Sequence, residues 1–264
     1  MRSNCSVWRS EGHYKKVFSA DSFARVLMKP WLLVDIAPGP GDAGELRLYR
    51  RDAEFSIRIG GRELMNSRVH GSEEALGALA CARLADRPRP RVLIGGLGMG
   101  HTLGAALQAL DAEAVVVVAE LIPEVVAWNR GPLGDLAGHP LRDHRVTVRE
   151  ADVVEILRAE QRAWDAVLLD VDNGPKALTR QGNDWLYGRA GLKAAFAALR
   201  PGGVLAVWSA GPDQAFSDSM RKTRFQVEEL HVRARGTRGG ARHTIWIATR
   251  PAGKTPQGDD RPAS

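Results

Sequence analysis

From residue 91 onward, short and mostly apolar segments alternate with segments of helical periodicity. Strands are predicted at Arg91–Ile94, Ala114–Ala119, Val146–Arg149, Trp164–Asp170 and Val204–Ser209. Helices are predicted at Thr102–Leu110, Pro123–Trp128, Val153–Glu160 and Leu192–Leu199. Apolar strands that are each followed by a helix are typical of a parallel sheet covered by helices on both faces. The sequence therefore predicts an α/β fold with a doubly wound sheet.

The N-terminal part has a different pattern. Glu45–Tyr49 and Glu54–Ile59 alternate apolar and polar residues, and Arg62–Met65 follows a Gly-Gly pair. This pattern predicts a small antiparallel β unit with a tight turn. A helix is predicted at Ser72–Leu84, with Ser72 as its N-cap. Residues 1–44 show no regular pattern.

The C-terminal part departs from the alternation as well. Phe225–Val232 and Thr244–Thr249 predict an antiparallel pair of strands, joined by an arginine-rich loop at 233–242. The last residues are rich in proline, glycine and charge, which is typical of disorder. We therefore expect an N-terminal segment at 1–88 with its β unit and helix, an α/β domain at 89–250 and a disordered tail at 251–264.

The composition excludes several classes of protein. The chain has 264 residues, 44% hydrophobic and 26% charged, which rules out collagen-like and wholly disordered chains. Its two cysteines, Cys5 and Cys81, cannot form a disulfide scaffold or a four-thiolate zinc site. No run approaches the roughly 20 apolar residues of a membrane helix, and the polar N-terminus lacks the apolar core of a secretory signal. We expect a cytoplasmic protein with no membrane partner.

A glycine-rich loop follows the strand at Arg91–Ile94. Gly96, Gly98 and Gly100 form a GxGxG pattern between a strand and a helix. Glycines at such a corner let the backbone approach a bound ligand closely, although a tight turn alone would also use them. A dinucleotide site favours GxGxxG, and His101 occupies the sixth position here. Nicotinamide and flavin cofactors are therefore disfavoured.

Acidic residues follow the next three strands. Glu120 lies about twenty residues beyond the loop, where a carboxylate accepts hydrogen bonds from ribose hydroxyls. Asp152 is placed to accept a hydrogen bond from an adenine amino group, or to cap the following helix. Asp170 ends the fourth strand. Because open α/β sheets bind ligands at the carboxyl ends of their strands, the glycines and these acids should share one crevice.

These motifs resemble those of the spermidine synthase family and, more broadly, of the class I S-adenosylmethionine-dependent methyltransferases. The resemblance covers about residues 45–250 and rests on VLIGGLGMG, VVAELIPEVV, READVVEIL, WDAVLLDVDNGP and LRPGGVLAVWS. It implies a Rossmann-like fold with a mostly parallel seven-stranded sheet, preceded by the small β unit. It also implies an S-adenosylmethionine-binding catalytic domain at 89–250 and a homodimer.

The resemblance leaves open which group is transferred. Aminopropyltransferases carry GGGDG in the loop, a DxxD-P pattern after the fourth strand and a Tyr-His-Glu run in the N-terminal gate. This chain has GGLGMG, Asp170 followed by Asn173, and His70-Gly71-Ser72-Glu73-Glu74. These departures favour methyl transfer from S-adenosylmethionine to a small-molecule acceptor. Aminopropyl transfer from decarboxylated S-adenosylmethionine is the alternative, and a cofactor-binding scaffold without catalysis is a third.

Several residues are candidates for the chemistry. Asp170 and Asp172 are the expected catalytic residues, and Asp170 also has a place at the cofactor. The expected acceptor residues are His70, Glu74, Asn173, Trp185 and Tyr187. Each has a plainer interpretation: first-turn charges that favour the helix dipole for the gate residues, and core packing for the two aromatic residues. His101 is a possible acid or base, or a residue of the helix surface.

Metal and nucleic-acid sites are not expected. The seven histidines show no i, i+4 pair with one another and no neighbouring cysteine. The net charge of +6 is modest for this length, and the arginines of the 233–242 loop have no interleaved aromatic residues. RNA modification would rest on this loop alone, which is expected to be a solvated hairpin loop.

Overall fold

The structure is a computed structural model that describes residues 29–39, 41, 44–171 and 183–252. The chain divides into two compact units, Met1–Pro30 and Trp31–Ser264, and all elements described here belong to the second. The predicted disordered tail lies, from residue 253, outside the described residues. None of the described helices is long and apolar enough to cross a membrane. The domain boundary expected near residue 88 stays a prediction.

A central sheet of seven strands organises the fold. Its spatial order is β10-β11-β9-β8-β5-β6-β7. Strands β9, β8, β5, β6 and β7 are parallel, whereas β11 runs antiparallel to both of its neighbours, β9 and β10. The strands are β5 Arg91–Gly95, β6 Val115–Glu120, β7 Val146–Glu150, β8 Trp164–Leu169, β9 Leu199–Ser209, β10 Gln226–Arg233 and β11 Arg242–Thr249. The predicted doubly wound, Rossmann-like sheet is therefore confirmed.

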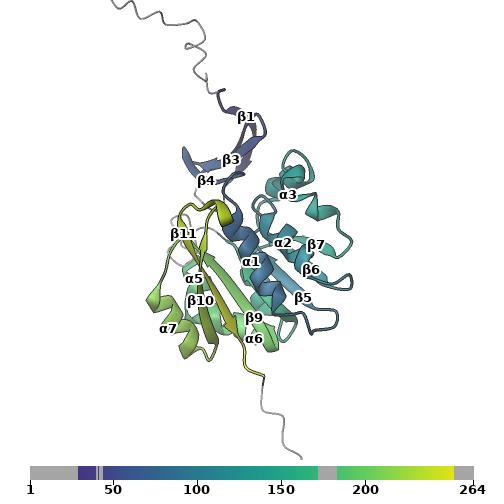
Figure 1. The fold of residues 1–264 in the computed structure, drawn as a ribbon, viewed down its shortest axis with the longest axis vertical. Helices are drawn as coiled ribbons and strands as arrows, with labels where there is room; N and C mark the ends of the chain where they lie inside the picture. Colours follow the sequence, from purple (N-terminus) through teal and green to yellow (C-terminus); the bar gives the residue numbers. More distant parts are fainter. Residues whose placement is uncertain (1–28, 40, 42–43, 172–182, 253–264) are drawn as a thin grey trace, which may run out of the picture. The chain divides into compact units, whose positions relative to one another are not determined.

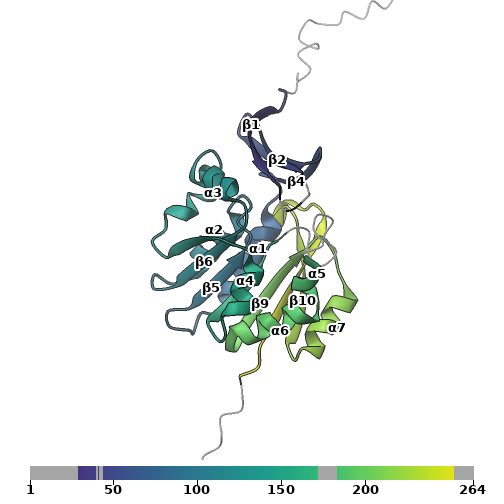
Figure 2. The same cartoon turned by 180° about the vertical axis from the view of Figure 1, so that it is seen from behind.

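Helices cover both faces of this sheet (Figures 1 and 2). One face carries α1 Gly71–Ala82, α2 His101–Ala109 and α3 Pro123–Arg130. The other carries α4 Val153–Ala159, α5 Asn183–Tyr187, α6 Arg189–Ala198 and α7 Gln214–Lys222. Short 3-10 helices occur at Gly134–Ala137, Pro140–Arg142 and Gly236–Arg238.

The core has two layers because side chains along a strand point to alternate faces. In β5, Val92 and Ile94 belong to the layer under α1, α2 and α3, whereas Leu93 belongs to the layer under α4 and α6. All three side chains are fully buried. Burial of one such side chain contributes about 1.5–3 kcal/mol, so both layers fix the position of the strand that leads into the glycine loop.

A second, N-terminal sheet consists of four antiparallel strands in the order β1-β2-β3-β4. They are β1 Leu32–Pro38, β2 Glu45–Arg51, β3 Glu54–Ile59 and β4 Arg62–Asn66. The prediction of the small β unit is confirmed, but the expectation of no regular structure before residue 45 is wrong. The register of β1 against β2 shifts between Leu33 and Asp35. This irregularity breaks the alternation by which a strand is recognised in sequence.

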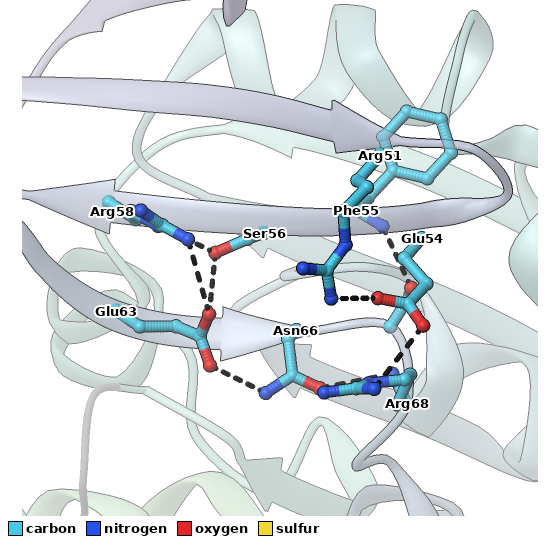
Figure 3. Close-up of polar contacts among 9 residues, drawn as sticks. Arg51, Glu54, Phe55, Ser56, Arg58, Glu63, Asn66 and Arg68 are labelled. Carbon is cyan, nitrogen blue, oxygen red and sulfur yellow. Dashed lines mark hydrogen bonds and ion pairs between the residues drawn. The ribbon is translucent and has the colours of Figure 1, made fainter. Parts of the chain in front are cut away.

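The two faces of the N-terminal sheet differ in polarity. On the face in Figure 3, Ser56 donates a hydrogen bond to Glu63 (2.7 Å) and Asn66 donates to the same carboxylate (2.6 Å), while Glu54 pairs with Arg51 (2.9 Å). Apolar side chains of β2 and β3 lie in the core instead. The Trp128 indole N–H of α3 donates to Asp35 of β1 (2.8 Å). The sheet thus presents its apolar side to the central sheet's helices.

The start of α1 differs from the prediction. The helix begins at Gly71 with His70 as N-cap, so Ser72 lies inside the helix and the prediction of a Ser72 cap is wrong. The Ser72 hydroxyl lies 2.8 Å from His243 Nδ1 of β11, and the Gly71 amide donates to the Ala234 carbonyl. A Cβ on Gly71 would collide with the backbone at Gly236. Contacts with the β10–β11 hairpin therefore set where α1 starts.

Candidate functional site

A cleft opens at the carboxyl ends of the central strands. From β5 the chain proceeds to β6 and β7 on one side, and β8 and β9 lie on the other, so the order reverses between β5 and β8. Ligands of open α/β sheets bind at such a reversal. The cleft has a floor in which glycines and acids lie among apolar side chains, and an apolar roof from the N-terminal sheet. The floor contains Gly96, Gly98, Glu120, Asp152 and Asp170, and the roof contains Leu46, Ile57, Ile59, Leu64 and Met65.

The glycine loop is shaped by close backbone contact. Gly96 has φ +89°, and a Cβ at this position would collide with the Asp170 carbonyl oxygen. Gly98 has φ +52° and faces the Met65 sulfur of the roof. Gly100 has φ +83° and is the N-cap of α2, and it is not among the described residues that line the cleft. The first two glycines therefore shape the floor, while the third turns the chain into α2.

Glu120 fixes the loop to the end of β6. The side chain is buried, and its two oxygens accept hydrogen bonds from the amides of Leu97 (2.8 Å) and Ile122 (2.9 Å). A carboxylate offers about four acceptor positions, so these bonds are compatible with ribose hydroxyls as additional partners. Its role at a ribose stays a prediction.

Asp152 has one of the two roles considered for it, that of a helix cap, and its contact with an adenine amino group stays a prediction. Its Oδ1 accepts a hydrogen bond from the Val154 amide (2.9 Å), which makes Asp152 the N-cap of α4. The residue also lines the cleft. The cap fixes its side chain where the residue lines the cleft.

Asp170 ends β8 and is the most perturbed acid of the floor. Burial raises its pKa to about 6, although the Thr102 hydroxyl, which donates to Oδ2 (2.6 Å), opposes the shift. Thr102 also lies 3.2 Å from the Glu73 carbonyl oxygen. Burial, together with repulsion from Asp170 and Glu74, raises the pKa of Glu73 well above its usual value. Two acids therefore share an environment that disfavours charge on both.

Thr102 was not anticipated from the sequence. The sequence feature that could have identified Thr102 is its position in the first turn of the helix after the glycine loop. A hydroxyl at this position can reach the end of the neighbouring strand. Its partners come from residue 170 and from the gate segment, 68 and 29 positions away along the chain. Only the packing of α1 against α2 and β8 brings these groups together.

Two of the expected acceptor residues, His70 and Glu74, meet His101 beside α1 and α2. His70 Nδ1 lies 2.9 Å from Glu74 Oε1, and the His70 and His101 rings stack with centroids 4.4 Å apart. Burial, with a smaller effect from His70, lowers the pKa of His101 to about 4. The ligand atoms of the three residues all lie within 4.8 Å of one another. The sequence did not reveal this group of possible metal ligands, because its members come from two separate helices.

The two expected aromatic acceptor residues, Trp185 and Tyr187, are not among the described residues that line the cleft. Tyr187 is buried and donates a hydrogen bond to the Val171 carbonyl (3.1 Å), and Trp185 lies beneath the Arg158 guanidinium. Of this segment, Leu186 lines the cleft. The plainer interpretation, packing, therefore describes both aromatic residues better. Asp172 and Asn173 lie outside the described residues.

Solved structures with a similar fold include spermidine synthases. One, in complex with the transition-state analogue AdoDATO, has a TM-score of 0.68 and 18% identity, over 83% of this chain and 74% of that one. The chain has a spermidine synthase-like fold. The Thermotoga maritima spermidine synthase gives a TM-score of 0.65 and 18% identity, over 83% of this chain and 73% of its own. A probable spermidine synthase from Corynebacterium glutamicum ATCC 13032 gives 0.54 and 16%, over 82% and 81%.

No family model and no curated protein matches the sequence. The spermidine synthase-like fold therefore rests on three-dimensional similarity. It confirms the resemblance inferred from the motifs and the expected architecture of an N-terminal sheet followed by a seven-stranded domain. The transferred group is a separate matter, which depends on the residues of the cleft.

Proposed function

We propose that this protein is an aminopropyltransferase that uses decarboxylated S-adenosylmethionine and an amine acceptor. The observation that carries this proposal is the charge of the cleft. Glu120, Asp152 and Asp170 lie on its floor, and no arginine, lysine or histidine occurs among the described residues that line it. Intact S-adenosylmethionine would bring a carboxylate into this acidic cleft. The charged groups of the decarboxylated form are all cationic.

This reasoning reverses the preference for methyl transfer drawn from the loop motifs. A charge-assisted hydrogen bond contributes about 1.5–3 kcal/mol. A cofactor carboxylate that faced Asp170 would form no such bond with it, because both groups are acceptors, and the two negative charges would repel each other. The amide of Leu97 in the glycine loop already donates to Glu120, and that of Gly100 donates to the Leu97 carbonyl. The fold similarity to proteins named spermidine synthases supports the same choice.

The cleft residues suit the cofactor's nucleoside. Gly96 and Gly98 line the cleft without side chains, so the backbone of the loop is accessible to a ligand there. Glu120 would hold the ribose, Asp152 the adenine edge, and the apolar roof the uncharged parts. When bound, the cofactor supplies an electrophilic carbon next to a cationic sulfur.

Asp170 is the proposed base. An amine acceptor arrives as an ammonium ion and must lose a proton before its nitrogen can form a bond to carbon. With a pKa of about 6, Asp170 is a stronger base than an ordinary carboxylate and is still ionised at neutral pH. The Thr102 hydroxyl would orient the carboxylate.

Product analysis tests the proposal. We expect incubation with decarboxylated S-adenosylmethionine and diamines such as putrescine to release 5′-methylthioadenosine together with an aminopropylated amine. Incubation with intact S-adenosylmethionine and the same amines should release no S-adenosylhomocysteine. Methylated amine as the main product would refute the proposal in favour of methyl transfer. Cofactor binding without any product over a broad amine panel would refute it in favour of a scaffold.

A further inference from the structure

A second cluster of chemically active side chains lies at the N-terminal ends of α1 and α2. It contains His70, the N-cap of α1, Glu74, one turn later, and His101, the first residue of α2. None of the three is among the described residues that line the cleft. The cluster is therefore distinct from the floor of glycines and acids, and the proposed reaction does not use it.

The hydrogen bonds of the described residues leave this cluster incomplete. His101 is 94% buried, since its exposed fraction is 6%, yet its Nε2 atom has no hydrogen-bond partner. His70 Nδ1 is also buried without a hydrogen bond, although Glu74 Oε1 lies only 2.9 Å away. Buried polar atoms are almost always satisfied in native proteins. Two unsatisfied imidazole nitrogens beside one carboxylate need an explanation.

We propose that His70, Glu74 and His101 bind a divalent transition-metal ion of the Zn²⁺ type. Two imidazoles and one carboxylate form a ligand set that suits zinc and its first-row neighbours, whereas Mg²⁺ and Ca²⁺ prefer oxygen ligands alone. The metal would occupy the lone pairs that now have no partner.

The distances suit one ion. The ligand atoms lie within 4.8 Å of one another, and two atoms bound to one zinc lie at most about 4.2 Å apart, because each bond is about 2.1 Å long. Small rotations close this difference. Half of the Glu74 side chain is exposed, so it has room to move, whereas His101 is buried and His70 stacks on it.

The charges around the cluster also favour a cation. The described ion pairs give the Glu74 carboxylate no partner other than His70. The N-terminal ends of two helices oppose a cation, but a helix dipole is weak beside three coordination bonds and acts only over the first turn. The ion would link α1 to α2 and so fix Thr102, the residue after His101, next to Asp170.

Metal titration tests the proposal with the full chain. After treatment with a chelator and its removal, we expect Zn²⁺ to bind with one saturable site per chain in calorimetry. Co²⁺ should give visible absorption bands that Zn²⁺ abolishes, and Mg²⁺ should not compete. Glu74→Gln removes one ligand from a half-exposed position without a cavity, and should weaken Zn²⁺ binding at least tenfold. His70→Ala should do the same.

Matched controls separate this site from adventitious binding. Glu155→Gln changes another exposed acid in the first turn of a helix, α4, and His144→Ala removes a largely exposed histidine. Both should bind Zn²⁺ as the unchanged protein does. Absence of saturable binding, or equal affinity in Glu74→Gln and the controls, would overturn the proposal. None of these readouts involves catalysis, so the result is independent of the proposed aminopropyl transfer.

Discussion

At the scale of single residues, the proposed chemistry of the cleft depends mainly on Asp170. Its carboxylate accepts a hydrogen bond from Thr102, and its backbone carbonyl excludes any side chain at position 96. The sequence placed Gly96, Gly98, Glu120, Asp152 and Asp170 at one sheet edge, and the structure brings these five to the cleft floor. Thr102 could not be found this way, because its contacts depend on how α1 and α2 pack.

Asp170→Asn should abolish activity while leaving the fold intact. Asparagine keeps an acceptor for the Thr102 hydroxyl but cannot take up a proton, so turnover should fall about 10²–10⁴-fold. Steady-state kinetics with decarboxylated S-adenosylmethionine measures this. Asp218→Asn, a change of an exposed acid in α7, should leave turnover unchanged. Equal turnover in both variants would remove Asp170 from the mechanism.

The same substitution should stabilise the protein at neutral pH. The folded-state pKa of Asp170 is raised to about 6 from 3.8, so the folded state holds this proton more tightly than the unfolded state. The stability that the group contributes is therefore full below pH 4 and is lost as the pH rises through 6. Thermal denaturation above pH 7 should give Asp170→Asn a higher melting temperature than the unchanged protein, by a few degrees. A lower melting temperature would contradict the assigned direction.

The pH dependence of turnover should reveal the effect of the Thr102 hydroxyl on the ionisation of Asp170. Activity of the unchanged protein should rise with pH through about 6, as Asp170 loses its proton. Thr102→Val removes the hydroxyl that favours the ionised form, and the rise should therefore move to higher pH. Rate profiles measured at saturating cofactor test this. An unshifted profile would show that the hydroxyl does not act on Asp170.

At the scale of elements, sequence patterns predicted the strands and helices of the central sheet well and their ends less well. Strands β5, β6 and β8 are apolar on both faces, which makes them easy to recognise. The segment Arg200–Gly203 resembles a break, yet it lies within β9. The register to β8 shifts there, from Trp164 opposite Leu199 to Ala166 opposite Val204. Pairing with a neighbour that is distant in sequence thus overrides the local signal.

The glycine loop gives a prediction at this scale. Gly96→Ala places a Cβ against the Asp170 carbonyl at φ +89°, which should displace the loop from β8 and lower cofactor affinity at least tenfold. Gly138→Ala is the matched control, because its φ is +73° but nothing lies within 4 Å of its Cβ. This substitution should lower the free energy of unfolding only by the strain of a left-handed residue, about 1–2 kcal/mol. Calorimetric titration and thermal denaturation of both variants separate collision from strain.

At the scale of the whole molecule, we expect a homodimer. Strand β1 is at the edge of the N-terminal sheet. It exposes Leu32, Leu33, Val34 and Ile36, and the exposed fraction of Leu32 is 65%. Exposed apolar side chains on an edge strand are suited to pairing with another strand. Light scattering should give twice the chain mass of 28.7 kDa. The double variant Leu33→Lys, Ile36→Lys should be monomeric. A monomeric unchanged protein would contradict this expectation.

The central claim is that the acidic cleft selects a cofactor without a carboxylate, and a competitive calorimetric titration tests it most directly. Decarboxylated S-adenosylmethionine and intact S-adenosylmethionine are each titrated into the unchanged protein at pH 7.5. We predict at least tenfold tighter binding of the decarboxylated form. Tighter binding of intact S-adenosylmethionine would contradict the account.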